Sequence, residues 1–247
     1  MGKADGLGTD IRGTVGRVFS ADGKWATVPS GQCCEYVGIV LESMVRFSAD
    51  EGRRIMSWVP AFEIGVWNAW MLMLYFPLHP LIMILVDKAV GTGEMMKKMG
   101  DVPYEKKEKR AFMTAMVILV FLILYSIFLP LKLGTVWFYA GLAIYLVGLA
   151  MFITAIVNIA TTPLGQPFAK GMYRYSRHPM LFSSFITWVG VSVASASWVF
   201  LLLSIVVMGL EVFQAIAEER GCLNVYGDEY REYLNVTPRW IGIPKSK

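Results

Sequence analysis

The sequence predicts an all-α fold, a polytopic membrane bundle of about five transmembrane helices. The composition is 55% hydrophobic and only 17% charged, with a mean hydropathy of +0.51, whereas about a quarter of the residues in a soluble domain are charged. The charge deficit falls on long apolar runs, because residues 1–54 and 87–110 are rich in charge. Roughly 20 apolar residues cross a bilayer. We therefore divide the chain into an N-terminal polar extension, 1–54, and a transmembrane domain, 55–247.

The first apolar region, 55–86, allows two interpretations because three prolines interrupt it. Proline removes a backbone donor and clashes with the preceding helical turn. One span from about Pro60 to Phe76, followed by a re-entrant or interfacial piece around His79-Pro80, fits this pattern, and two short spans also fit. Four later spans follow, at about 111–131, 135–160, 179–194 and 198–217.

The connections between the later spans predict two helical hairpins and one cytoplasmic face. The turns 132–134 and 195–197 are short, so each joins antiparallel helices. The loop 87–110 has seven Lys/Arg, and the 161–178 connector and the tail are also basic. Because basic residues favour cytoplasmic loops, these three segments share the cytoplasmic side. The side of the N-terminus depends on whether 55–86 crosses once or twice.

The polar extension 1–54 is glycine-rich at first and then carries an apolar stripe over residues 35–47. Spacing near i, i+3, i+4 and i+7 predicts a short amphipathic helix there. This helix could be a surface helix, lie on the membrane or pack against a membrane-protein partner. No apolar core follows a basic start, so we expect no cleaved signal peptide.

Composition also argues against several classes of function. The net charge is +4, and no basic run is interleaved with aromatic residues, so nucleic-acid binding has no support. Cys33, Cys34 and Cys222 form no even disulfide framework and have neither the spacing nor the histidines of a zinc site. We therefore expect reduced thiols and no metal.

The residues that carry chemistry lie at the two ends of the last predicted hairpin. Arg177 and His178 precede Pro179, which suits the first turn of a helix. A cation and an imidazole beside unpaired backbone donors favour a carboxylate. Glu218 and Glu219 stand where the second helix leaves the bilayer, and antiparallel helices of similar length bring these ends together. The result is a basic pole and an acidic pole able to hold a zwitterionic, cationic ligand.

The last long helix predicts a polar face inside the bundle. Glu211, Gln214 and Glu218 are spaced i, i+3 and i+7, so they share one face. An acid within a span is costly and marks a functional or paired site facing the bundle interior. Glu211 therefore either contributes to a site or is hydrogen-bonded to a neighbouring helix.

Three motifs in this region resemble one membrane-enzyme superfamily. They are the run Gly171-x-Tyr173-x-x-x-Arg177-His178-Pro179, the acidic pair Glu218-Glu219, and the box Tyr226-Gly-Asp-Glu-Tyr230. In this order, flanking an apolar hairpin, they resemble the isoprenylcysteine carboxyl methyltransferase and phospholipid methyltransferase superfamily. The resemblance covers roughly residues 165–244.

The resemblance implies an integral-membrane methyltransferase that uses S-adenosyl-L-methionine on a lipid or small lipophilic acceptor. In that superfamily the Arg-His-Pro segment and the preceding tyrosine line the cofactor pocket, and the first glutamate of the pair lies near the reacting centre. We assign Glu218 and Gln214 as candidate catalytic residues. The candidate cofactor-binding residues are Phe168, Tyr173, Arg177, His178, Pro179, Met180, Leu181, Glu218 and Glu219. Their expected pocket opens on the cytoplasmic side of the membrane.

Two positions depart from the carboxyl methyltransferases. The basic residue that they carry one turn before the glutamate is Gln214 here, and the connector 165–168 lacks their histidine-led stretch. An amide cannot pair with a carboxylate as an arginine does. The departure argues against prenylcysteine carboxylate as the acceptor.

Two other classes of function remain open at the sequence level. Sterol and related membrane reductases share a similar C-terminal half but use a nicotinamide cofactor, and they usually have more spans. A non-catalytic subunit of a larger membrane complex could keep the same fold, with residues 1–54 as its contact to a partner.

Overall fold

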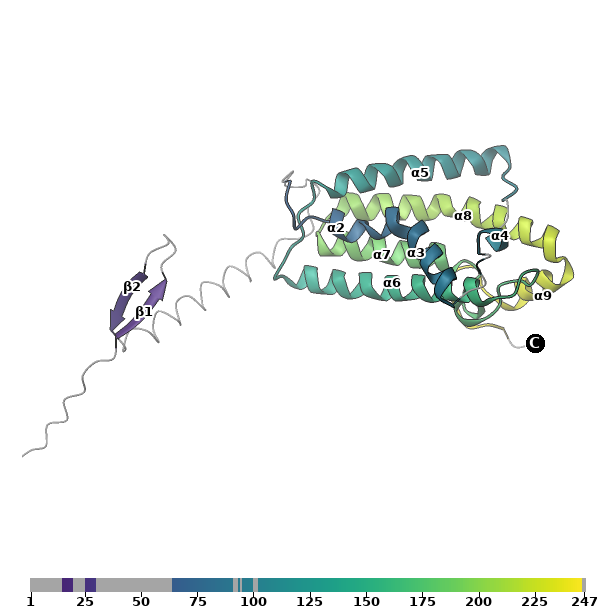
Figure 1. Cartoon of the computed structure of the whole chain (residues 1–247). Helices are drawn as coiled ribbons and strands as arrows, with labels where there is room; N and C mark the ends of the chain where they lie inside the picture. Colours follow the sequence, from purple (N-terminus) through teal and green to yellow (C-terminus); the bar gives the residue numbers. More distant parts are fainter. Residues whose placement is uncertain are drawn as a thin grey trace, which may run out of the picture. The chain divides into compact units, whose positions relative to one another are not determined.

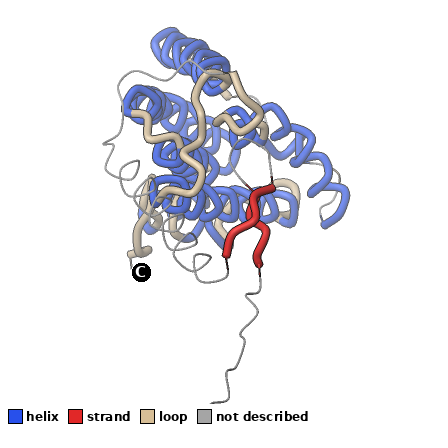
Figure 2. Tube along the Cα trace, turned by 90° about the vertical axis from the view of Figure 1, so that its left-hand side faces the viewer, coloured by secondary structure: helices blue, strands red, loops and turns tan. Residues whose placement is uncertain are grey.

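The computed structural model (Figure 1) describes residues 15–19, 25–29, 64–90, 93, 95–99 and 102–245. The chain divides into two compact units, Met1–Arg53 and Arg54–Lys247. In the first unit, β1 (Val15–Phe19) and β2 (Trp25–Pro29) form an antiparallel hairpin, red in Figure 2, with Val15 opposite Pro29. This hairpin was not predicted from the sequence, although β-branched and aromatic residues favour strands. The predicted amphipathic helix over 35–47 lies outside the described residues.

The described part of the second unit is all-helical, which confirms the predicted class. Four of its helical segments are long and apolar enough to cross a membrane: Trp70–Val90, Lys106–Ser126 (α5), Val136–Thr161 (α6) and Trp198–Tyr226 (α8). A shorter apolar helix, α7 (Pro179–Ala194), packs against both α6 and α8. Helix α5 packs against α8 (Figure 1). This is the helical membrane bundle that the sequence predicts.

The first span is displaced from its predicted position. Helices α2 (Trp70–Met73) and α3 (Tyr75–Val90) follow each other with a break at Leu74, and α3 runs through Pro77 and Pro80. The predicted span ending at Phe76, with a re-entrant piece around His79-Pro80, is therefore wrong. Pro77 lies in the first turn of α3, where a missing N–H costs little. Pro80 is on the exposed side of α3, so its ring does not disturb the core.

Glycines bring α6 and α7 into close contact. A Cβ on Gly141 would lie 2.2 Å from the Ala194 nitrogen, and one on Gly148 would lie 2.7 Å from the Thr187 nitrogen. A Cβ on Gly190 would lie 2.5 Å from the Tyr145 nitrogen. Small residues allow membrane helices to approach at backbone distance and gain van der Waals contact. The α6–α7 pair is therefore the tightly packed centre of the bundle.

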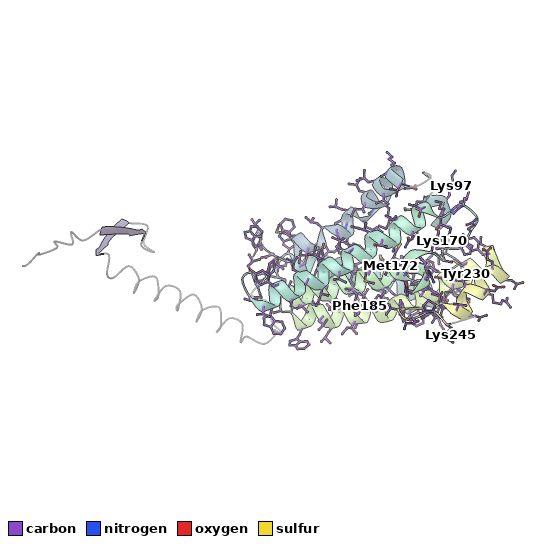
Figure 3. All side chains as sticks on the ribbon, turned by 90° about the horizontal axis from the view of Figure 1, so that it is seen from below. Lys97, Lys170, Met172, Phe185, Tyr230 and Lys245 are labelled. Carbon is purple, nitrogen blue, oxygen red and sulfur yellow. The ribbon has the colours of Figure 1, made fainter. Side chains whose placement is uncertain are left out.

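The two short turns lie together at one end of the bundle. Thr135 and Ser197 cap the next helices by accepting hydrogen bonds from the backbone N–H groups of Phe138 and Phe200. The Lys132 N–H donates to the Ala194 carbonyl at 3.0 Å, which joins one turn to the other. The connector, α4 (Met95–Met99) and α9 (Asp228–Val236) lie at the opposite end, where Figure 3 labels Lys97, Lys170 and Lys245. We call this the connector end.

Buried charged groups fasten the loops at the connector end. Lys98 is buried, and its Nζ donates to the Ala160 carbonyl at 2.8 Å, so α4 caps the C-terminus of α6. Arg220 of α8 binds Glu108 in the first turn of α5, and also donates to the Pro103 carbonyl at 2.8 Å. These contacts hold the segment before α5 against α8.

Candidate active site

His178 is fixed where the connector enters α7. The short 3-10 helix η1 (Gly171–Arg174) precedes it, and Gly171 has a positive φ of 57°. The His178 backbone N–H donates to Ser176 Oγ at 3.2 Å, and Pro179 begins the helix. The imidazole is buried at the connector end.

The imidazole of His178 lies between two carboxylates of α8. Its Nδ1 is 3.0 Å from Glu218 Oε2, and its Nε2 is 3.2 Å from Glu219 Oε1. Burial lowers the pKa of His178, but the hydrogen bonds with Glu218 and Glu219 outweigh burial and place its pKa above the ordinary value. Two acceptors on one ring favour the imidazolium, which donates to both.

Glu219 connects three segments of the chain. Its Oε1 lies 3.0 Å from Arg177 Nη1 in the connector. Arg239 of the tail donates from Nε at 2.9 Å and from Nη2 at 2.8 Å, a bidentate pair. Both oxygens of Glu219 are therefore used in holding His178, Arg177 and Arg239 together.

Glu218 is held differently from its neighbour. Gln214 Nε2 donates to Glu218 Oε1 at 2.8 Å, while His178 occupies the other oxygen, and Glu218 stays partly exposed. Glu211, one turn deeper on the same face, is buried, and its Oε2 has no hydrogen-bond partner in the described structure. The predicted polar face of α8 is present, with Gln214 orienting Glu218.

Aromatic side chains of the connector and the tail lie in the same region as the imidazole. Tyr173 is buried and packs against Phe168 with ring centroids 5.6 Å apart, and Phe168 and Met180 join the same apolar cluster. Trp240 lies 6.1 Å from the imidazole, ring to ring. Leu181 is half-buried in the first turn of α7. Thus the structure gathers His178 and the acidic pair with Arg177, and places Tyr173, Phe168 and Met180 in one cluster.

Comparison with protein families shows what this part of the chain is similar to. Residues 136–229, from the start of α6 to the first turn of α9, match the phospholipid methyltransferase family model. This part of the chain is similar to the phospholipid methyltransferases. The predicted superfamily resemblance is confirmed. The comparison with curated proteins found no match.

The matched residues include His178, Gln214, Glu218 and Glu219, but the tail that carries Arg239 lies beyond them. The matching family is one of membrane methyltransferases, which supports the same broad class for this protein. In the described residues, no group of three or more His, Cys, Asp or Glu side chains could hold a metal ion.

Three residues that the structure brings to this site are not among the candidates predicted from the sequence. Arg239 lies in the tail, and its pairing with Glu219 depends on how the tail folds back. Tyr233 donates from its hydroxyl to the Tyr173 carbonyl at 2.6 Å. Asn158 lies against Gly171, and its Nδ2 is buried without a partner in the described structure. The sequence feature that could have indicated Asn158 is its position in the last turn of α6.

Proposed function

We propose that this protein is an S-adenosyl-L-methionine-dependent methyltransferase that acts at the membrane on a lipid or small lipophilic acceptor. The observation that carries the proposal is the imidazole of His178 held between Glu218 and Glu219 within the residues that match the phospholipid methyltransferase family model. The arrangement combines cations, carboxylates and aromatic side chains at one end of a membrane bundle. We place that end on the cytoplasmic side, where a water-soluble cofactor is available.

The polar groups around His178 fit such a cofactor. S-adenosyl-L-methionine carries a carboxylate, an ammonium, a sulfonium and an adenine ring. Two buried donors, Arg177 Nε and Asn158 Nδ2, have no hydrogen-bond partner in the described structure and can serve the anionic and polar parts. The partly exposed carboxylate of Glu218 complements the positive charges. We propose these cofactor-binding residues: Phe168, Tyr173, Arg177, His178, Pro179, Met180, Leu181, Glu218 and Glu219.

When bound, the cofactor supplies an electrophilic methyl group, so the protein needs to supply alignment and exclude water. His178 and Gln214 hold one oxygen of Glu218 each, which fixes the direction of its carboxylate. Glu218 then positions the acceptor or takes its proton. Glu219 holds the connector and the tail against α8.

The polar face of α8 favours an acceptor that is neutral or cationic. It offers Glu211, Gln214 and Glu218, two acids and an amide. Leaving a charge unpaired in a buried site costs about 3–5 kcal/mol. Arg177 and Arg239 both form ion pairs with Glu219. A prenylcysteine carboxylate would therefore be a poor acceptor, and an amine, thiol or hydroxyl on a lipophilic body suits the site.

Cofactor binding by the full chain in lipid nanodiscs tests this function. Calorimetric titration should show saturable binding of S-adenosyl-L-methionine and none of NADPH. His178→Ala and Glu218→Gln each remove a charge-assisted hydrogen bond worth about 1.5–3 kcal/mol, so each should weaken cofactor binding about tenfold or more.

Glu229→Gln serves as the matched control, since Glu229 is an exposed acid on α9 and should leave binding unchanged. Thermal melting verifies that each variant is folded. Tighter binding of NADPH would indicate a reductase, and binding of neither compound would indicate a non-catalytic subunit. If both site variants bind like the parent, the residue assignment is wrong.

A further inference from the structure

The first turns of α5 separate acidic from basic side chains. Glu105 and Glu108 turn toward α8 and share Arg220, with Glu108 buried. Lys106, Lys109 and Arg110 are exposed, and no ion pair joins them to other described residues. The acids of this segment therefore do not neutralise its outward surface, which is basic.

The basic surface borders a shallow, wide-open groove with a volume of about 590 Å³. The residues that line it are Lys106, Lys109, Arg110, Met113 and Thr114. Their spacing of i, i+3, i+4, i+7 and i+8 puts them on one face of the helix. The cations lie at the N-terminal end of this face, and Met113 and Thr114 lie one turn further toward the C-terminus of α5. Beyond the groove, toward the C-terminus of α5, Val117 and Phe121 are 67% and 51% exposed. These two side chains continue the apolar surface along the helix.

This order of chemistry matches an anionic phospholipid. Three cations attract a phosphate and a further anionic group, and juxtamembrane clusters of basic residues bind anionic headgroups. The apolar surface that follows offers contact for acyl chains, which free phosphate lacks. A zwitterionic lipid would bring its own ammonium toward Lys106, Lys109 and Arg110, so these residues disfavour it.

We propose that the groove on α5 binds the headgroup of an anionic phospholipid, with its acyl chains along the apolar surface of the same helix. The groove residues all belong to α5, whereas His178, Glu218 and Glu219 lie on α7 and α8. The lipid site therefore shares no residue with the proposed cofactor site, and it does not depend on methyl transfer.

Lipid retention by the purified full chain tests this site. Native mass spectrometry counts phosphatidylglycerol or phosphatidylcholine bound in detergent, with inorganic phosphate as a competitor. The parent should retain phosphatidylglycerol in preference to phosphatidylcholine. Lys106→Gln, Lys109→Gln and Arg110→Gln combined should reduce phosphatidylglycerol binding by about tenfold or more.

The matched control combines Lys107→Gln, Arg231→Gln and Lys245→Gln, which removes the same charge from the connector end but leaves the groove intact. It should bind phosphatidylglycerol like the parent. Arg110→Gln alone provides a milder variant, expected to weaken binding in the same direction, if the triple variant does not fold. Equal losses in the groove and control variants would overturn the proposal, because general attraction would then explain binding. Phosphatidylcholine binding equal to that of phosphatidylglycerol, or displacement of phosphatidylglycerol by inorganic phosphate, would also overturn it.

Discussion

At the scale of single residues, the site depends on the protonation of His178. Glu218 and Glu219 approach its two ring nitrogens, at 3.0 and 3.2 Å, so the charged imidazole has a partner on each side. Arg177 and Arg239 share Glu219 and compete for its charge. The balance leaves the pKa of His178 above its ordinary value, although burial acts in the opposite direction. Charge at this position is therefore coupled to folding.

The coupling predicts a pH-dependent contribution of His178 to stability. A folded-state pKa above the unfolded value of about 6.5 stabilises the protein below that value. The contribution is lost as the pH rises through the folded-state pKa. We expect the difference in melting temperature between the parent and His178→Asn to be largest at about pH 6, just below the unfolded-state pKa of roughly 6.5. It should shrink toward alkaline pH.

Nitrogen-15 NMR of the histidine side chains measures the pKa of His178 independently, since the chain has only two histidines. Glu218→Gln and Glu219→Gln should each lower the pKa of His178, because each removes a carboxylate partner of the imidazolium. Glu229→Gln, on the exposed side of α9, should leave the titration unchanged. A melting difference that is constant across pH would contradict a charged imidazole in the folded protein.

At the scale of helices, the site depends on the close approach of α6 and α7. His178 lies at the start of α7. Helix α6 supports the connector through Asn158 and through its own C-terminus, which Lys98 caps. Gly148 faces Thr187 and Ser183 at backbone distance. A wider spacing of the two helices would move α7, and with it the imidazole, relative to Glu218.

Adding one methyl group at this contact should therefore weaken the fold. The Cβ of Gly148→Ala would meet the Thr187 nitrogen at 2.7 Å and the Ser183 carbonyl oxygen at 3.0 Å, so backbone must shift. Such overpacking costs about 1–3 kcal/mol. Thermal melting in nanodiscs should show a lower transition for Gly148→Ala.

Gly209 of α8 offers the matched control for this substitution. A Cβ there has no neighbour within 4 Å, so Gly209→Ala adds the same atom in open space. It should leave the transition unchanged or raise it, since alanine favours a helix over glycine by about 1 kcal/mol. Equal effects of Gly148→Ala and Gly209→Ala would show that helix spacing does not limit stability.

At the scale of the whole molecule, the connector end gathers the site and the basic loops. Lys97, Lys170 and Lys245 lie at this end in Figure 3. The short turns with Leu133 and Ala196 lie at the other end. The structure thus groups these segments at one end of the bundle, and the basic residues favour the cytoplasm for that end.

Cysteine accessibility in intact cells tests this topology. In a chain without Cys33, Cys34 and Cys222, we expect Lys97→Cys, Lys170→Cys and Lys245→Cys to react only after permeabilisation. Lys97 is preferable to its neighbour as a probe, because Lys98 is buried against α6.

Leu133→Cys, in the turn at the opposite end, should react with an impermeant reagent from outside. Leu133 is exposed, so burial does not prevent labelling of a cysteine at this position. Reaction of Lys97→Cys and Lys245→Cys from opposite faces would contradict the proposed topology.

Much of this protein was determined by local features of its sequence. Long apolar runs separated by short turns determined the membrane bundle, since only helices satisfy the backbone of such segments in lipid. The spacing of His178 and Glu218 at two ends of one hairpin determined that they would meet. The shared helix face of Glu211, Gln214 and Glu218 followed from helical periodicity.

Only the tertiary structure decided which partners complete the site and where the first span lies. The span Trp70–Val90 passes through Pro77 and Pro80, which a local reading treats as breaks, because the missing N–H groups fall in a first turn and on an exposed side. Arg239 reaches Glu219, and Lys98 reaches Ala160, from segments distant in sequence. Such pairings depend on how loops fold back over the helix ends, and neither hydropathy nor periodicity encodes that path.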